Sequence, residues 1–215
     1  LLYGEAFRAP ALNETQLINN SVIIGNPDLI HETVKTWDLI WHWESESSSF
    51  IASLFHNKFQ DPIETSLENN IRQFVNGPSS FSKGIEIEAS QQLSENWYLR
   101  ETYSYFWELP ESSFRESDKL ASIFVNYQKE SWNWNLSVVY HGEKQSPSAQ
   151  NLIDLEERTL INSKLIYQLN KNTEFQLVVK NLLDDTYYDA ASGNTLAEGL
   201  PNRGRELSAS VLFEF

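Results

Sequence analysis

Two glutamates are the residues of this sequence best placed for acid–base chemistry. Glu86 and Glu88 are two residues apart, which puts them on one face of a predicted strand at a separation of about 6.6 Å. Paired carboxylates at such a separation hydrolyse glycosidic bonds in other proteins. No serine stands in a nucleophile elbow, however, and no glycine-rich phosphate loop is present. We therefore expect the two glutamates to line a wetted surface, and we expect no enzyme activity.

Residue types that bind metals are present without the spacing of a metal site. The histidines are scattered, with no partner two or four residues along: His31, His42, His56 and His141. Asp184, Asp185 and Asp189 could supply oxygen ligands to Ca²⁺, but they lack the donor spacing and central glycine of a calcium loop. The absence of cysteine removes thiolate ligands. We expect solvated acidic loop residues here, no metal and no cofactor.

The composition excludes several classes of protein. The 215 residues carry 16 Lys+Arg against 30 Asp+Glu, a net charge of −14, which argues against nucleic acid because phosphate binding depends on cationic side chains. No apolar run approaches the roughly 20 residues of a membrane-spanning helix. Aromatic residues make up 13%, too many for a disordered chain. The absence of methionine predicts that Leu1 lies within a longer protein.

Apolar and polar residues alternate along most of the chain. Every second residue from Leu207 to Phe215 is apolar, and the segment from Trp132 to Tyr140 follows the same pattern. Because successive side chains of a strand point to opposite faces, these segments are predicted to be strands with two different faces. The pattern predicts ten strands: Leu1–Phe7, Thr33–Glu44, Phe50–Gln60, Ser82–Gln92, Trp97–Trp107, Ser117–Tyr127, Trp132–His141, Arg158–Leu169, Thr173–Asn181 and Arg205–Phe215.

The predicted connections alternate between short and long. Short polar turns follow every second strand, and the other connections are long irregular segments, at residues 8–32, 61–81, 108–116, 142–157 and 182–204. Outer-membrane barrels have short periplasmic turns, longer extracellular loops and aromatic girdles near the strand ends. The predicted fold is therefore all-β, a transmembrane antiparallel up-and-down barrel. A soluble antiparallel sheet with one wet face would have the same alternation.

Four blocks of residues stand in order along the chain. They are Phe7-Arg8-Ala9-Pro10, Asn26-Pro27-Asp28-Leu29, Gly84-Ile85-Glu86, and Asn181-Leu182-Leu183-Asp184, the last followed by Asn202-Arg203-Gly204-Arg205. Together these blocks resemble the C-terminal part of the barrel of TonB-dependent outer-membrane receptors. Each block is weak alone, but their order and their spread over nearly the whole chain make the resemblance specific.

The resemblance implies a barrel of 22 strands plugged by an N-terminal domain, as in outer-membrane transporters with a plugged lumen. Residues 1–215 would be a C-terminal portion of that barrel, with the plug domain and the N-terminal strands absent. Such receptors lie in the outer membrane of Gram-negative cells and import scarce nutrients with energy delivered by the TonB complex through the plug. A ferric siderophore is the expected ligand, because it is the commonest ligand class in the family. Haem receptors of this family tend to carry a histidine between the first two blocks, and the absence of histidine from Ala11 to Gly25 argues against haem.

The last predicted strand carries an apolar row that ends in an aromatic residue. The row consists of Leu207, Ala209, Val211, Phe213 and Phe215. It resembles the recognition signal of the barrel-assembly machinery, which would bind it by strand addition. The same residues would also face lipid, and both interpretations fit the row.

Several side chains in the long loops offer rings or hydrogen-bonding groups to a ligand. They are Arg72, Phe74, Trp107, Tyr187, Tyr188 and Arg203. An anionic ferric chelate would need cationic contacts once desolvated, which conflicts with the acidic composition. A neutral or cationic ligand, or a site built largely from another part of the receptor, would remove the conflict.

Two rival functions belong to other classes of protein. A passive porin, or a closed ten-stranded barrel, would share the alternation and the long loops, and its first strand would pair with its last. A soluble carbohydrate-binding β-sandwich would instead bury the face formed by Trp132, Trp134, Leu136 and Val138 in a protein core.

Overall fold

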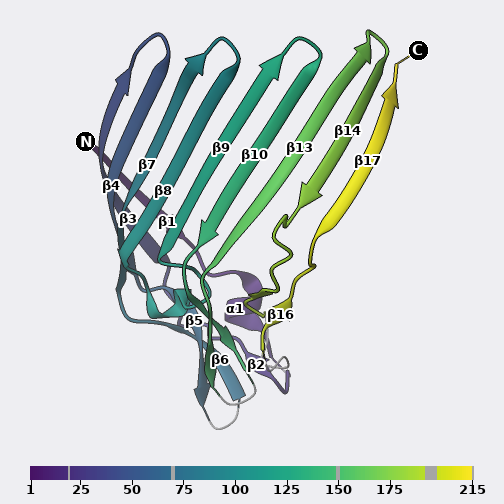
Figure 1. Cartoon of the computed structure of the whole chain (residues 1–215). Helices are drawn as coiled ribbons and strands as arrows, with labels where there is room; N and C mark the ends of the chain where they lie inside the picture. Colours follow the sequence, from purple (N-terminus) through teal and green to yellow (C-terminus); the bar gives the residue numbers. More distant parts are fainter. Residues whose placement is uncertain (19, 69–70, 149–150, 192–197, 215) are drawn as a thin grey trace. The chain divides into compact units, whose positions relative to one another are not determined.

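Ten long strands form one antiparallel sheet in the computed structural model (Figure 1). The structure describes residues 1–18, 20–68, 71–148, 151–191 and 198–214, so that Phe215 lies outside the described residues. The hydrogen-bonded order of the strands is β1 (Leu2–Arg8), β3 (Glu32–Glu44), β4 (Ser48–Gln60), β7 (Ser80–Ser94), β8 (Trp97–Glu108), β9 (Lys119–Lys129), β10 (Trp132–His141), β13 (Arg158–Asn170), β14 (Thr173–Lys180) and β17 (Glu206–Phe213). All ten predicted strands are confirmed, with small shifts at their ends.

Several strands end at residues that cannot continue a regular ladder. Pro10 follows the end of β1 and fixes the backbone where the chain leaves the sheet. Asp61 has a φ of 52° directly after β4, and Asn181 has a φ of 49° directly after β14. Asp and Asn tolerate this left-handed conformation better than most residues. The long loops therefore begin where the backbone turns out of the strand direction.

The long segments contain secondary structure of their own. Their elements are α1 (Leu12–Gln16), a 3₁₀ turn (Glu111–Ser113), β2 (Ile23–Ile24), β5 (Ile63–Glu68), β6 (Ile71–Asn76), β11 (Lys144–Pro147), β12 (Leu152–Leu155), β15 (Tyr188–Asp189) and β16 (Leu200–Pro201). The prediction that these segments are irregular was wrong, because such short pieces are too brief to show a hydrophobic period. None of the helices in the described part of the chain has the length and hydropathy needed to cross a membrane.

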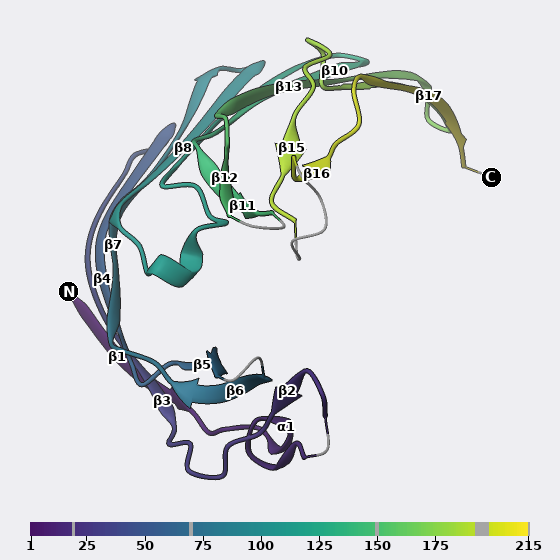
Figure 2. The same cartoon turned by 90° about the horizontal axis from the view of Figure 1, so that it is seen from below.

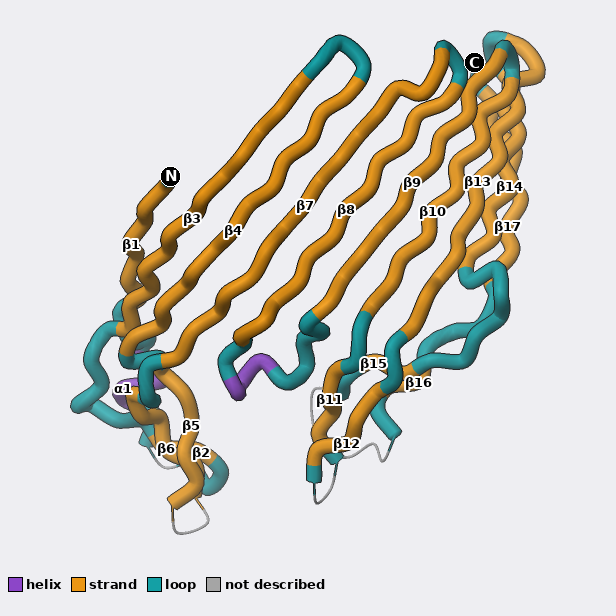
Figure 3. The backbone as a smooth tube through the Cα atoms, turned by 60° about the vertical axis from the view of Figure 1, so that its left-hand side comes forward, coloured by secondary structure: helices purple, strands orange, loops and turns teal. Residues whose placement is uncertain are grey.

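The chain divides into two compact units. Unit 1 holds residues 1–40, 54–84 and 107–111, and unit 2 holds residues 41–53, 85–106 and 112–215. Within unit 1, β2, β6 and β5 form a three-stranded sheet close to α1 (Figure 2). Within unit 2, the β11–β12 hairpin continues beyond the ends of β10 and β13 (Figure 3).

The strand register in unit 2 gathers apolar side chains on one face of the sheet. Trp132 lies opposite Tyr167, with ring centroids 4.5 Å apart, and the residues that follow alternate in the same way. Nothing in the described part of the chain covers this face, since Phe213 is 62% and Val211 46% exposed. The only buried hydrophobic residues among those described are Leu155, the last residue of β12, and Ala191, which follows β15, and neither belongs to the ten-stranded sheet. The apolar face therefore meets the surrounding medium and not a protein core.

The opposite face of the same strands carries hydrogen-bonded polar side chains. Asn126 Nδ2 donates to Asn133 Oδ1 at 2.8 Å and to Asn135 Oδ1 at 3.0 Å. On the neighbouring strands Arg100 Nη2 lies 3.0 Å from Glu88 Oε1. These groups satisfy one another without protein covering them, which is the behaviour of a wetted surface.

Both rival architectures disagree with these findings. A β-sandwich would bury the face formed by Trp132, Trp134, Leu136 and Val138, yet none of these four residues is buried. A closed ten-stranded barrel would pair its first and last strands, whereas β1 and β17 stand at the two ends of the hydrogen-bonded order of described strands. Neither of these two rival architectures matches the described sheet.

The contact of Gly25 with α1 gives a test of the loop structure. A Cβ at Gly25 would lie 2.6 Å from Leu17 N and 2.8 Å from the Thr15 carbonyl carbon, and this backbone cannot move without shifting the helix. We expect Gly25→Ala to destabilise the loop by about 1–3 kcal/mol, the usual cost of overpacking. Hydrogen exchange at the α1 amides should accelerate accordingly. Gly4→Ala is the control because nothing lies within 4 Å of its Cβ position, and equal exchange in the two variants would contradict the prediction.

Candidate functional site

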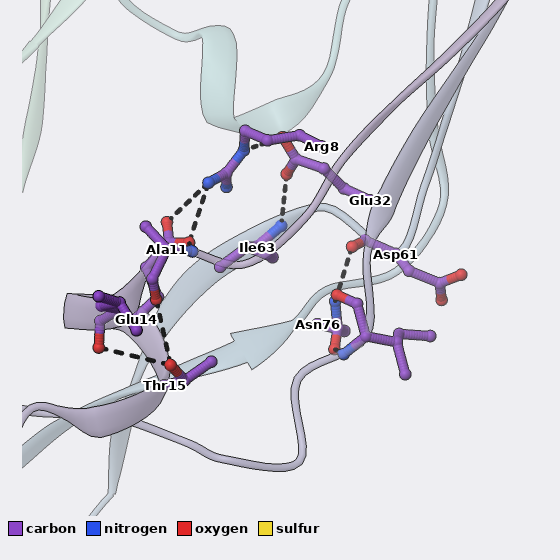
Figure 4. Close-up of polar contacts among 10 residues, drawn as sticks. Arg8, Ala11, Glu14, Thr15, Glu32, Asp61, Ile63 and Asn76 are labelled. Carbon is purple, nitrogen blue, oxygen red and sulfur yellow. Dashed lines mark hydrogen bonds and ion pairs between the residues drawn. The ribbon is translucent and has the colours of Figure 1, made fainter.

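An ion-pair cluster lies where β1 ends and β3 begins in unit 1. Arg8 Nε contacts Glu32 Oε1 at 2.5 Å, and Arg8 Nη1 contacts the two oxygens of Glu14 at 2.9 and 3.0 Å (Figure 4). Glu14 also accepts the N–H of Ala11 at 2.7 Å, which caps α1. The hydrogen bonds from Arg8, with that of Ala11, lower the pKa of Glu14. Glu32 reaches a further loop by accepting the N–H of Ile63 at 2.9 Å. We call Arg8, Glu14 and Glu32 the Arg8 cluster.

A second cluster joins the loops of unit 2 around Asp189. Lys144 Nζ and Arg158 Nη2 both lie 2.7 Å from Asp189 Oδ1, and Asn202 Nδ2 donates to Oδ2 at 2.5 Å. Burial alone would raise the pKa of Asp189, but the hydrogen bonds from Lys144, Arg158 and Asn202 outweigh burial and lower it to about 2. We call these four residues the Asp189 cluster. They fix β11, β13, β15 and the segment after β16 to one another.

A cavity of about 550 Å³ lies beside the Asp189 cluster in unit 2. Arg158 lines it, and the Arg158 guanidinium lies 4.6 Å from the centre of the Tyr187 ring. The other charged residues of the lining are all carboxylates: Asp154, Glu156, Glu157, Asp185 and Glu198. Because Arg158 is already paired with Asp189, the cavity presents a strongly negative surface to a ligand.

The structure places the six predicted ligand-binding residues in different surroundings. Tyr187 and Tyr188 both line the cavity. Arg203 does not line it; this residue is 88% exposed at its side chain and pairs with Glu206 at 3.2 Å. Arg72 and Phe74 alternate along β6 in unit 1, where the Phe74 carbonyl accepts Asn26 Nδ2 at 3.0 Å. Trp107 lies near the end of β8, half exposed.

The residues of the recognised blocks make local contacts at the strand ends. Asn181 is buried and its side chain bonds both the N–H and the carbonyl of Asp185, which shapes the turn after β14. Arg205 N donates to Asp184 Oδ1 at 2.7 Å just before β17. Gly84 is buried within β7, and Glu86 is exposed on the same strand.

Sequence reasoning missed the two ion-pair clusters. The sequence predicts Asp184, Asp185 and Asp189 as solvated acidic loop residues, but Asp189 binds two cationic side chains. Its partners Lys144 and Arg158 are 45 and 31 residues away, so no local spacing could have indicated them. In the sequence Arg8 stands only as part of the Phe7–Pro10 block, and nothing in that block predicts its pairing with Glu14 and Glu32. Within the described ranges no three His, Asp or Glu side chains group as metal ligands.

Known structures share this fold at low sequence identity. A mutant of the ferric enterobactin receptor PfeA from Pseudomonas aeruginosa is 17% identical, with a TM-score of 0.78 over 99% of this chain and 37% of that one. The siderophore receptor PirA from Acinetobacter baumannii is 14% identical, with a TM-score of 0.80 over 99% and 38%. The copper transporter OprC is 20% identical, with a TM-score of 0.77 over 99% and 36%. This chain thus spans somewhat more than a third of each of these three proteins.

The sequence matches a family model over most of its length. The match covers residues 2–182, from β1 through β14, and the family is described as TonB dependent receptor-like, beta-barrel. No curated protein matches the sequence closely enough to count as a relative. The family match agrees with the antiparallel strand order, with the exposed apolar face and with the neighbouring structures. The chain belongs to the β-barrel family of TonB-dependent receptors.

Proposed function

We propose that this chain is the C-terminal portion of the barrel of an outer-membrane receptor that imports a ferric siderophore through TonB. The observation that carries the proposal is the uncovered apolar face of the sheet in a protein of this family. Hydrocarbon is the medium that suits such a face, and the outer membrane of a Gram-negative cell supplies it. A closed barrel would also satisfy every backbone N–H and C=O within the lipid.

The proposed partners follow from the two kinds of surface. Outer-membrane lipid would contact the apolar row, and the barrel-assembly machinery would recognise Leu207, Ala209, Val211 and Phe213, which alternate along β17. Phe215, the last residue of that predicted signal, lies outside the described residues. The TonB complex would act through a plug domain of the same receptor, since the family match concerns the barrel.

The ligand class is supported by the neighbours and refined by the cavity. Two of the three neighbouring structures are named as receptors for ferric enterobactin or a siderophore. The cavity of this chain has five carboxylates against one arginine that is already paired. An anionic ferric complex would be repelled by this lining. We therefore propose a ferric siderophore whose complex carries no net negative charge.

The proposed uptake can be tested in a strain that lacks the full receptor gene. We expect growth on one or more neutral or cationic ferric siderophores, each supplied as the sole iron source, to be lost and to return when the gene is restored. Growth on ferrous iron should stay unchanged, because it does not depend on the receptor. Unaltered growth on every ferric complex, or loss of growth on cobalamin instead, would contradict the proposal.

The negative lining can be tested by removing three of its charges together. We expect the variant Glu156→Gln, Asp185→Asn, Glu198→Gln to bind a cationic ferric complex roughly tenfold less tightly, since three exposed charge contacts of about 0.5 kcal/mol each amount to one power of ten. Binding of the radiolabelled complex to whole cells measures this. The control changes three carboxylates outside the cavity lining, Glu46→Gln, Glu95→Gln and Glu130→Gln, and should leave the affinity unchanged. Equal affinities in the two triple variants would contradict the role of the lining.

The Asp189 cluster predicts a pH dependence of the cavity wall. Because its folded-state pKa of about 2 lies below the ordinary 3.8, Asp189 stabilises the loops above about pH 4, and this contribution disappears as the pH falls through 2. The Asn202 N–H donates to the Tyr187 carbonyl and the Ala191 N–H donates to Ser146 Oγ. Asp189→Asn should raise exchange of these two amides about tenfold at pH 7, because about 1.5 kcal/mol of charged hydrogen bonding is lost. Exchange corrected for its intrinsic rate should then no longer depend on pH between 4 and 2. Asp154→Asn, at an exposed position, is the control. Protection of the Asn202 and Ala191 amides that survives Asp189→Asn would refute the prediction.

A further inference from the structure

Two loops of unit 1 that are distant in sequence share one small sheet. The first loop is described at residues 9–18 and 20–31, and the second at residues 61–68 and 71–79. Strand β2 from the first loop pairs in parallel with β6 from the second, with Ile23 opposite Arg72 and Ile24 opposite Gln73. The Arg72 N–H also donates to the Val22 carbonyl at 3.1 Å. Since β6 pairs on its other side with β5, the second loop brings a complete hairpin to the first.

Two asparagine side chains add bonds between the same loops. Asn76 exchanges hydrogen bonds with Ile30, donating to its carbonyl at 3.1 Å and accepting its N–H at 2.9 Å, and it also holds the Asp61 carbonyl at 2.8 Å (Figure 4). Asn26 Nδ2 donates to the Phe74 carbonyl at 3.0 Å. Each asparagine thus uses its side chain to satisfy backbone groups of the other loop. Separation of the loops would leave these groups without their protein partners.

The Arg8 cluster joins the two loops once more at their base. The Glu32 carboxylate holds Arg8 through one oxygen and the N–H of Ile63, at the start of β5, through the other. Arg8 in turn holds Glu14 of α1 in the first loop. Gly25 lies against the backbone of α1, and its N–H donates to the Leu17 carbonyl at 2.7 Å, which joins the two parts of the first loop. A continuous series of hydrogen bonds therefore connects α1 to β5, from Glu14 through Arg8 and Glu32 to the N–H of Ile63.

We infer that these two loops act as a single rigid body in the receptor, joined by β2–β6 pairing and by the side chains of Asn26 and Asn76. A displacement imposed on one loop by a ligand is carried to the other. Ligand passes beside the joined loops and not between them. This last statement about passage rests on the proposed uptake function, whereas the coupling of the loops does not.

The coupling is tested by the distance between spin labels in the purified full receptor. Val22 and Leu67 are 66% and 67% exposed, one in each loop, and the chain contains no cysteine of its own. Because neighbouring strands lie about 4.8 Å apart, labels at Val22→Cys and Leu67→Cys should give one narrow distance distribution in the dipolar broadening of continuous-wave electron paramagnetic resonance spectra of the frozen receptor. The added pair Asn26→Ala and Asn76→Ala should broaden it. Labels at Leu67→Cys and Ile71→Cys, both within the β5–β6 hairpin, are the control and should stay narrow in both backgrounds.

Either of two results would overturn the coupling. One is a broad or multiple distribution between Val22 and Leu67 before any asparagine is changed. The other is a distribution that remains narrow when both asparagines are replaced, which would remove their role. Neither measurement requires ligand or transport, so the failure of the proposed uptake function would leave this test intact.

Passage of ligand is tested by cross-linking the two loops. Ile24→Cys and Gln73→Cys occupy partner positions of the parallel pair, where a disulfide can form without moving the backbone. Uptake of the ferric siderophore that supports growth should be equal before and after reduction of this disulfide. If the disulfide blocks uptake and its reduction restores uptake, the inference is overturned. The control is a disulfide between Glu64→Cys and Val75→Cys, within one hairpin, which should not affect uptake. If neither the parent receptor nor the reduced variant takes up the siderophore, this result counts against the proposed uptake function and not against the coupling.

Discussion

Alternate side chains of each strand face opposite sides of the sheet, and in this chain the two sides require different media. Trp132 and Tyr167 meet on one side, while the Asn126, Asn133 and Asn135 amides bond to one another on the other. The backbone between them is satisfied by the strand ladder, so the side chains alone decide what surrounds the sheet. Because only Leu155 and Ala191 are buried hydrophobic residues among those described, the fold cannot depend on a core of its own. The need for an apolar medium outside follows from that arrangement.

The absence of a core beneath the loops also explains how they are organised. Hydrophobic burial stabilises a loop little when there is little apolar surface for it to pack against. Ion pairs and hydrogen bonds of charged and amide groups stabilise these loops instead. Asp189 binds Lys144, Arg158 and Asn202 at once, and its lowered pKa reflects those bonds. Exposed ion pairs contribute little, but the Lys144 and Arg158 side chains are only 13% and 12% exposed, which strengthens each contact.

The charges that line the cavity of unit 2 are mostly negative. Its cavity is lined by carboxylates, and its arginine is already occupied by Asp189. Membership of the receptor family fixes the architecture and leaves the ligand to the loops, as the fold shared with a copper transporter at 20% identity illustrates. The neighbouring structures therefore do not indicate the charge of a ligand for this chain, and only its own loop residues bear on that charge.

The sequence alone determined the strands, because alternation from Leu207 onward or through Trp132–His141 is a local signal that pairing merely confirms. It also indicated the family, through blocks such as Phe7–Pro10 whose order is readable without coordinates. Only the tertiary structure decided which loop residues meet. Asp189 and Arg158 are 31 residues apart, as are Glu32 and Ile63, and Asn26 and Phe74 are 48 residues apart, so no period connects them. Local patterns fix strands because the backbone imposes a period of two, whereas contacts between loops depend on where the folded strands bring the loop ends together.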